Sequence, residues 1–375
     1  MRSVFLLLAL LGGPAVHAQV LTTEVWLGRL DMREGRFAVT DLQNISRHPG
    51  YDNQPAFFPD GASLLFTTEA ENVAESGLGV HAVRYFIDSG RSVALTSARG
   101  FSPTPTPDGK FIMTLREGSV WLHDIDGKPL ENLLPHVKTA GYYTRMDQDR
   151  WVLFMNEPDR RIAIWDQQRF SLAKIVPNAI TAPYRVPGEM AVTFVVQEGD
   201  RKTIKHLALT EDRGSLDREI GVIPFKTGGH HVWTSRGTIL MASGNTIYEW
   251  DRNRPDDWKV VHRFREPDLQ GITRIALGPR EDLIALVSVP NDRTVLSESR
   301  AAINEGFAGA YVRTPDSWDL ATDRAIERGT WVRRWRAGGT DRELHGDYTV
   351  TWRKTIGGSG TPLWNIETET YKSRP

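Results

Sequence analysis

The chain has 375 residues, with 46 Lys and Arg against 47 Asp and Glu, 40% hydrophobic and 25% charged residues, and no cysteine. These are ordinary globular proportions, and they exclude a disordered, collagen-like or disulfide-stapled chain. The length allows two or three domains, or one large all-β domain with an appendage. Without cysteine we also expect neither a lipid-anchored N-terminus nor a thiolate metal site.

The N-terminus has the pattern of an export signal. Arg2 precedes a short apolar run, Val4 to Leu11, and the small residues of Val16-His17-Ala18 predict cleavage after Ala18. The run is too short to span a bilayer, so an uncleaved anchor helix is the less favoured alternative. We therefore expect a periplasmic or secreted protein with residues 1–18 removed.

The charge of the mature chain argues against two classes of partner. Removing residues 1–18 removes Arg2 and no acidic residue, which leaves 45 basic residues against 47 acidic ones. With a net charge of −2 and no polybasic face, the chain predicts no binding to nucleic acid or to a membrane surface.

A polar strand joined through a tight turn to an apolar strand recurs six times. The clearest copies are YDNQPAFFPDGASLLFTTE (51–69) and FSPTPTPDGKFIMTLRE (101–117). The residues that mark the six turns are Gly61, Gly109, Asp149, Gly188, Gly237 and Glu281. From residue 61 to residue 281 there are five steps with a mean of 44 residues, a period typical of four-stranded propeller blades. The second strand of each copy is a continuous apolar run, which predicts burial on both faces.

The two ends of the repeat array are predicted to pair. A second pair of strands follows each of the first five turns, but not the sixth. Thr23–Leu30 and Arg36–Leu42 supply strand signals of this kind at the other end of the array. Pairing them with the sixth copy closes a ring and removes its open edges. The alternative is an open array with two exposed edges.

The first two copies closely resemble the signature repeat of TolB-like six-bladed β-propellers. The segments GYYTRMDQDRWVLFM, GHHVWTSRGTILMASGNTIYEWD and GITRIALGPREDLIALVS are similar to a group of small exported TolB-like proteins of undefined function. The resemblance implies an all-β fold in which residues 19–289 form a six-bladed propeller closed by N-terminal strands. It also implies a periplasmic platform that binds a protein or an envelope component, and it implies no shared catalytic residues.

Beyond Val289 the period stops. Ser297 is predicted to cap a helix that runs to about Val312. Long strand signals follow at Ala325–Arg336, Leu344–Thr355 and Leu363–Tyr371. Five of the 12 tryptophans lie in the final 58 residues, too many for a disordered tail, so this region must fold or dock.

This tail is similar to the later two-thirds of a SnoaL-like domain, the α+β cone of the ketosteroid isomerase fold, through SRAAINEGFAGAYV, AIERGTWVRRW, GDYTVTWRK and PLWNIETETY. The resemblance implies a small, truncated α+β module at residues 290–375. Leu283 to Pro290 could be the last propeller strand or the first strand of this module. Since the module lacks its leading helices, we expect its sheet to dock on the propeller or on a second copy, giving a homodimer.

The first strand of each propeller blade lines the axial channel. The residues expected there are Asp52, Gln54, Ser102, Thr104, Tyr142, Arg145, Tyr184, Arg185, His230, Trp233 and Arg274. This mixture of Arg, His and aromatic groups suits an acidic or amide-bearing partner. A water-filled channel without a specific pocket is the alternative.

Catalytic motifs are absent. No His-Glu-x-x-His, Walker loop, dinucleotide fingerprint or Gly-x-Ser-x-Gly occurs, so we expect no metal and no cofactor. His230 and His231 are adjacent, and strand alternation would point them to opposite faces. Four acids that could pass for catalytic groups are expected to be turn residues that accept backbone hydrogen bonds: Asp60, Asp108, Asp124 and Asp126.

We therefore predict a binding protein rather than an enzyme. The alternative is an enzyme or small-molecule binder that uses a pocket of the C-terminal module. In enzymatic SnoaL-like proteins, an acid or histidine inside the cone can act as general base. The groups available for that role are Glu327, Asp347, His345 and Tyr348. Glu327 shares its predicted face with Trp331, where desolvation could raise its pKa, but an exposed Glu327 or one paired with a nearby arginine is the favoured interpretation.

Overall fold

The computed structural model describes residues 23–32, 37–46, 51–69, 80–156, 158–212, 214–289, 312–337, 340–356 and 362–373. The predicted signal segment lies outside these ranges. The chain divides into two compact units, one within Thr22–Gly306 and one within Phe307–Pro375. The described residues are nearly all β, apart from one short 3₁₀ helix, η1 (Pro267–Leu269). None of their helices is long and apolar enough to cross a membrane.

The described residues of the N-terminal unit form six four-stranded antiparallel sheets, five of them from consecutive strands. The first sheet consists of β3 (Asp52–Phe57), β4 (Ser63–Glu69), β5 (Val80–Phe86) and β6 (Arg91–Arg99), and the second of β7 (Phe101–Pro105), β8 (Ile112–Arg116), β9 (Ser119–His123) and β10 (Pro129–Asn132). The third consists of β11 (Ala140–Arg145), β12 (Arg150–Met155), β13 (Arg161–Asp166) and β14 (Ser171–Pro177), and the fourth of β15 (Tyr184–Arg185), β16 (Ala191–Glu198), β17 (Arg201–Leu209) and β18 (Ser215–Ile223). The fifth consists of β19 (His231–Trp233), β20 (Thr238–Ser243), β21 (Thr246–Asp251) and β22 (Arg254–Arg263).

The sixth sheet joins the two ends of the unit. Its strand order is β2 (Ala38–Asn44), β1 (Glu24–Asp31), β24 (Leu283–Val289) and β23 (Gly271–Leu277). β1 pairs antiparallel with β24, from Glu24 opposite Ser288 to Arg29 opposite Leu283. The N-terminal strands therefore supply the outer half of the sheet that the last repeat begins, and β24 is one of its central strands.

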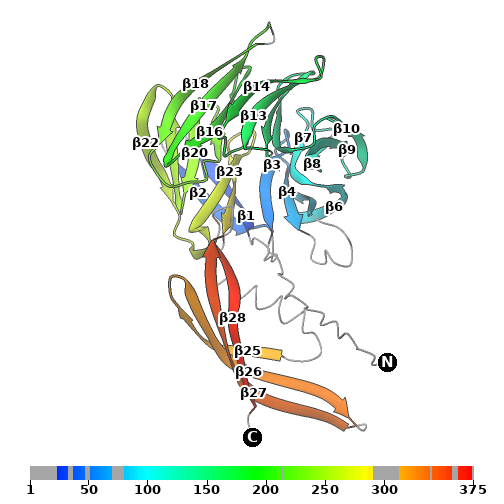
Figure 1. Cartoon of the computed structure of the whole chain (residues 1–375), viewed down its shortest axis with the longest axis vertical. Coiled ribbons are helices and arrows are strands. Elements are labelled where there is room, and N and C mark those ends of the chain that lie inside the picture. The colour runs from blue at the N-terminus through cyan, green and yellow to red at the C-terminus, as the bar shows by residue number, and fades with distance from the viewer. Residues whose placement is uncertain are drawn as a thin grey trace, which may run out of the picture. The chain divides into compact units, whose positions relative to one another are not determined.

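Successive sheets contact one another in sequence, mostly through their first strands. Among the first strands, β3 contacts β7, β15 contacts β19, β19 contacts β23, and β23 contacts β3, whereas β11 contacts the second strand of the preceding sheet, β8. Between β11 and β15 the link is the Thr144 hydroxyl, which donates to the carbonyl of Pro183 at 2.5 Å. In Figure 1, β3 and β23 lie toward the middle of the unit, and β18 and β22 lie at its periphery. The last sheet thus meets the first.

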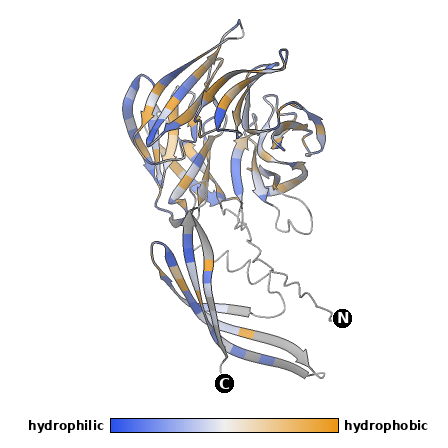
Figure 2. Ribbon diagram, viewed as in Figure 1, coloured by the Kyte–Doolittle hydropathy of each residue, from blue (hydrophilic) through white to orange (hydrophobic). Residues whose placement is uncertain are grey.

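An apolar cluster fills each junction between neighbouring sheets. The clusters form because the second strands are apolar on both faces: β4, β16 and β24 each have six consecutive buried residues. Figure 2 shows apolar residues running through the interior of this unit. At the junction between the sixth sheet and the first, Val25 and Leu27 of β1 pack with Leu64 and Phe66 of β4. Burial of these faces is the main force that holds the sheets together.

Three of the four turn acids accept backbone hydrogen bonds, as predicted, and Asp126 does not accept one from any described residue. The Asp60 Oδ1 accepts the backbone N–H of residue 62 at 2.9 Å, and the Asp108 Oδ1 accepts that of Lys110 at 3.2 Å. The Asp124 Oδ1 accepts the N–H groups of Asp126 and residue 128 at 3.1 and 2.8 Å. Asp126 therefore enters this turn as a donor, through its own backbone.

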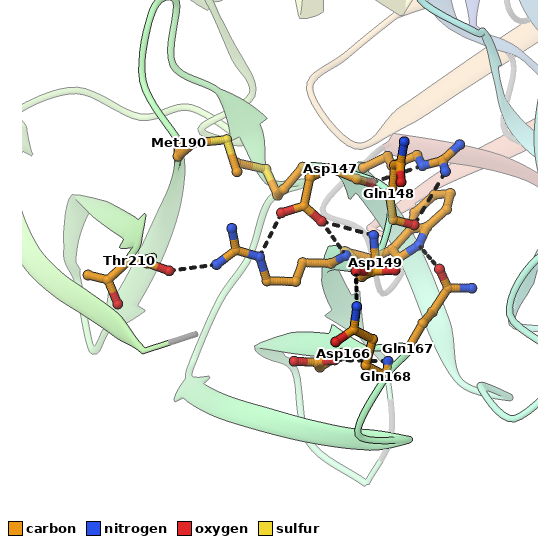
Figure 3. Close-up of polar contacts among 12 residues, drawn as sticks. Asp147, Gln148, Asp149, Asp166, Gln167, Gln168, Met190 and Thr210 are labelled. Atoms are coloured by element: carbon orange, nitrogen blue, oxygen red, sulfur yellow. Dashed lines mark hydrogen bonds and ion pairs between the residues drawn. The ribbon is translucent and has the colours of Figure 1, made fainter. Parts of the chain in front are cut away.

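One polar network connects two neighbouring sheets at their edge (Figure 3). The Arg150 Nε donates to the Asp147 carboxylate at 2.7 Å, and its Nη1 donates to the carbonyl of Thr210 at 2.8 Å. Arg150 opens β12, whereas Thr210 follows β17 in the next sheet. The Gln168 side chain donates to the Asp149 carboxylate at 2.5 Å in the same network. These hydrogen bonds add a polar tie to the apolar junction.

The described residues of the C-terminal unit form one four-stranded antiparallel sheet in chain order. Its strands are β25 (Val312–Leu320), β26 (Arg324–Ala337), β27 (Thr340–Ile356) and β28 (Pro362–Ser373). The three predicted strands are present and longer than expected. β25 was not predicted. The helix expected from Ser297 was predicted to end at about Val312, which is the first residue of β25. The signal was weak because Pro315 sits at an irregularity of β25, an edge strand, where proline is tolerated. The rest of the helix expected from Ser297 lies outside the described residues.

Candidate functional site

Four of the residues expected to line a channel meet in the N-terminal unit, and each comes from a different sheet. Tyr142 lies on β11, Tyr184 on β15, His230 immediately before β19 and Arg274 on β23. The Arg274 Nη2 donates to the Tyr142 hydroxyl at 2.5 Å, and its Nη1 contacts the His230 Nδ1 at 3.2 Å. The Tyr184 hydroxyl lies 2.5 Å from the same histidine nitrogen. We call these four residues the inner cluster.

Irregular pairing aims these side chains. The register of β11 shifts between Ala140 and Tyr142, and that of β23 shifts between Ile272 and Arg274. Each strand thus carries one extra residue directly before the residue of the inner cluster. A β-bulge of this kind re-aims the following side chain, and bulges are frequent beside binding sites.

The same device occurs in the two neighbouring sheets. β3 is irregular between Asn53 and Ala56, and β7 between Phe101 and Thr104. Within these bulges Gln54 and Ser102 have positive φ angles of 60° and 53°. The Gln54 Oε1 accepts the backbone N–H of Ser102 at 2.7 Å, which satisfies a donor that the bulge removes from the ladder.

The hydrogen bonds fix the protonation of His230. A guanidinium can only donate, so the His230 Nδ1 must accept from Arg274, and the Tyr184 hydroxyl must donate to the same nitrogen. His230 is therefore neutral, with its proton on Nε2. Burial, with a smaller contribution from the charge of Arg274, lowers its pKa well below 6.5. Burial also raises the pKa of Tyr184, which keeps its hydroxyl neutral.

Arg274 carries the charge of the inner cluster. Desolvation by itself lowers the pKa of Arg274, but the neighbouring tyrosine hydroxyls outweigh it and raise the pKa overall. In the described part of the chain, no carboxylate lies within ion-pair distance of its guanidinium. The cluster is thus a single positive charge among neutral donors and acceptors.

A cavity of about 430 Å³ adjoins the cluster, because Tyr142 lines it. Its further lining includes Tyr51, Gln54, Phe101 and Asn156. Tyr51 was not among the residues expected in the channel, of which Asp52 is the first in the chain. Its ring meets that of Phe101 edge-on at a centroid distance of 6.0 Å, and burial raises its pKa. An aromatic residue directly before the first strand was the signal that could have pointed to it.

Other residues expected in the channel lie elsewhere. Trp233 is 7% exposed, belongs to an apolar cluster and donates its Nε1–H to the Thr193 hydroxyl at 2.8 Å, so its placement in the channel was wrong. The reason is strand alternation: Trp233 lies on the same side of β19 as the buried His231. Arg145 and Arg185 are exposed and donate to backbone carbonyls.

Two further channel candidates make contacts outside the inner cluster. Asp52 is fully buried, and its backbone N–H donates to the carbonyl of Thr23 at 3.1 Å. Thr104 donates its hydroxyl to the carbonyl of Ser102 at 3.0 Å, within the bulge of β7. Neither makes a contact with the inner cluster among those resolved here.

His231 has a structural role. Its Nδ1 lies 3.0 Å from the carbonyl of Gly229 and its Nε2 lies 2.9 Å from the Thr193 hydroxyl, so both ring nitrogens are satisfied inside the core. Burial lowers its pKa to about 4. No group of three His, Cys, Asp or Glu residues in the described ranges is arranged to hold a metal ion.

In the C-terminal unit, the structure separates the four catalytic candidates. Glu327 and Tyr348 share a buried face of the sheet: the Tyr348 hydroxyl donates to the Glu327 Oε1 at 2.5 Å, and the Trp352 Nε1 donates to its Oε2 at 3.3 Å. His345 and Asp347 are exposed, and the His345 Nε2 lies 2.6 Å from the Glu343 carboxylate.

The face that carries Glu327 is closed. Glu327, Trp331, Tyr348 and Trp352 are each at most 4% exposed to a water-sized probe. A side chain that lined a cavity large enough for a substrate would retain accessible surface there. The buried Glu327 side chain is instead hydrogen-bonded by its sheet neighbours, as buried polar groups usually are. The C-terminal unit therefore has no open pocket at Glu327, where the alternative of an enzyme would need one.

Comparisons with known proteins bear on the fold. No protein-family model and no curated protein matches the chain. A solved structure from Agrobacterium tumefaciens, provisionally assigned as TolB, is 12% identical and covers 71% of this chain and 97% of its own, with a TM-score of 0.50. A gluconolactonase of Xanthomonas campestris is 9% identical over 70% of this chain and 94% of its own, with a TM-score of 0.49. TolB of Acinetobacter baumannii is 13% identical over 72% and 64%, with a TM-score of 0.32. The first of these likenesses shows a TolB-like, all-β propeller fold.

Proposed function

We propose that the chain is exported, cleaved after Ala18, and acts in the periplasm as a non-catalytic six-bladed β-propeller that binds a protein or envelope component. The observation that carries the proposal is the convergence of Tyr142, Tyr184, His230 and Arg274 from four sheets, beside a cavity of about 430 Å³. Bulges aim two of these side chains inward, and cavities of this size are typical of ligand sites.

The partner test uses the mature chain, residues 19–375, immobilised and exposed to periplasmic extract at mild salt. We expect one partner to be retained, to be identified by mass spectrometry, and to bind saturably when purified. The variant Tyr142→Ala/Tyr184→Ala should lose it. The matched control is Phe170→Ala/Leu216→Ala, because both residues are exposed, at 69% and 65%. Failure of the wild-type chain to retain any partner would count against the proposal.

Export is tested separately. Mass spectrometry of the chain recovered from the periplasm should give an N-terminus at Gln19. A chain that keeps Met1 in the cytoplasm would contradict the location. The same sample, examined by sedimentation, tests whether the C-terminal unit, proposed as a partial SnoaL-like module, forms a homodimer.

A further inference from the structure

Arg274 is a cation held among neutral partners. Its guanidinium has five N–H donors, and the resolved contacts with Tyr142 and His230 use two of them. Its side chain keeps partial exposure although protein surrounds it closely enough to desolvate it. No carboxylate in the described ranges pairs with this guanidinium, so its charge and its remaining donors are left for an anion that enters the site.

The neutrality of His230 sets the size of that charge. Because the His230 Nδ1 accepts two hydrogen bonds, the inner cluster offers one positive charge rather than two. A monoanion balances it, whereas a phosphate dianion would remain half uncompensated in a desolvated site. The planar guanidinium also matches a carboxylate through two parallel hydrogen bonds.

The adjoining cavity indicates what the anion is attached to. Tyr51, Phe101 and Tyr142 give it aromatic walls, and Gln54 and Asn156 add amide groups. Glu117 also lines it, but its carboxylate is 3.2 Å from the guanidinium of Arg116. The walls therefore suit an apolar or aromatic body with few polar groups.

We propose that the inner cluster binds a carboxylate carried on an apolar or aromatic body, with Arg274 as the direct partner of the carboxylate and the Tyr142 hydroxyl, which accepts from Arg274 and keeps its own proton, as a flanking donor. This inference rests on the proposed binding function and specifies its ligand chemistry. The carboxylate can belong to a small organic acid or to the C-terminal residue of a protein partner.

Isothermal titration of the mature chain tests the chemistry. The probes are N-acetyl-phenylalanine and its amide, a hexapeptide ending in phenylalanine as free acid and as amide, and inorganic phosphate. We expect at least one acid to bind about tenfold or more tightly than its amide and more tightly than phosphate. Preference for the peptide acid identifies a protein C-terminus as the source, and equal affinity identifies a small acid. Equal binding of acids and amides, or tighter binding of phosphate, overturns the proposal.

Variants test the role of Arg274. Arg274→Met should weaken binding of the preferred acid about tenfold or more, while its circular dichroism spectrum shows that the variant is still folded. Arg254→Met is the matched control, since Arg254 is exposed on β22 and loses the same charge. If Arg274→Met does not fold, Arg274→Lys keeps the charge but loses the bidentate geometry, and it should also bind more weakly. Unchanged affinity in the folded variant overturns the proposal.

The two proposals fail in different ways. If the wild-type chain and Arg274→Met retain the same protein partner equally well, the carboxylate site is wrong and the binding platform stands. If the wild-type chain retains no partner yet binds the acid probes in an Arg274-dependent way, the platform for a protein is wrong and the carboxylate site stands.

Discussion

Truncating Leu27 tests whether the N-terminal strand is part of the core. Leu27 lies on β1, is 3% exposed, and stands opposite Ala285 of β24. It packs in the cluster that also contains Leu64 and Phe66 of the first sheet. The alanine opposite it cannot expand into the space that Leu27→Ala would leave. We therefore expect a loss of about 3 kcal/mol in the free energy of unfolding, in the range for buried leucines.

Urea unfolding followed by circular dichroism measures this loss, and a thermal scan should show a midpoint lower by about 6–12 °C. The control is Thr40→Ala on β2, whose side chain is exposed and whose replacement should change stability by less than about 0.5 kcal/mol. If Leu27→Ala unfolds at the same urea concentration as Thr40→Ala, β1 does not seal the junction and the pairing of the two ends is refuted.

Three further predictions concern stability and the inner strands. Arg150→Ala removes the polar tie of Figure 3 and should cost about 1–2 kcal/mol in urea unfolding, whereas Arg254→Ala on the exposed surface should cost less than about 0.5 kcal/mol. His231 has a pKa of about 4 in the folded chain and of 6.5 in the unfolded chain, so the unfolded state takes up the proton first as the pH falls. The free energy of unfolding should therefore decrease by roughly 3 kcal/mol between pH 6.5 and 4. In His231→Gln, the slope of the free energy of unfolding against pH should be smaller, by an amount that corresponds to at most one proton. Gly141→Ala would place a Cβ 2.6 Å from the Asn156 side chain, so partner capture should fall about tenfold, whereas Phe170→Ala at an exposed position should leave capture unchanged; unchanged capture by Gly141→Ala would argue against the bulge.

Much of the N-terminal unit could be predicted because its signals are local. Continuous apolar runs and tight turns mark the second strands, and each such run in the structure is buried. Pairing of the N-terminal strands with the last repeat also followed from counting strands, and β1 does pair with β24. These features need no knowledge of distant contacts.

The site was harder to predict because bulges determine which face of a strand its side chains lie on. One extra residue flips every later side chain of a strand to the other face. A glycine within a strand, such as Gly141, suggests a bulge, but nothing in the sequence at Thr273 announces one. Trp233 was placed in the channel although it lies in the core, because regular alternation along β19 puts it on the same side as the buried His231. β25 was not predicted because Pro315 weakens its strand signal. A proline is tolerated within a strand only at an edge or a bulge, and the sequence does not show that β25 is an edge strand.

Photo-cross-linking tests most directly whether the partner binds at the inner cluster and the cavity beside it. A photo-reactive phenylalanine analogue replaces either Glu117, which lines the cavity, or Phe170, which is 69% exposed at the turn between β13 and β14. Irradiation in periplasmic extract should attach the partner to the chain labelled at position 117 and leave the chain labelled at position 170 unmodified. Attachment at position 170 with none at position 117 would contradict a binding site at the inner cluster.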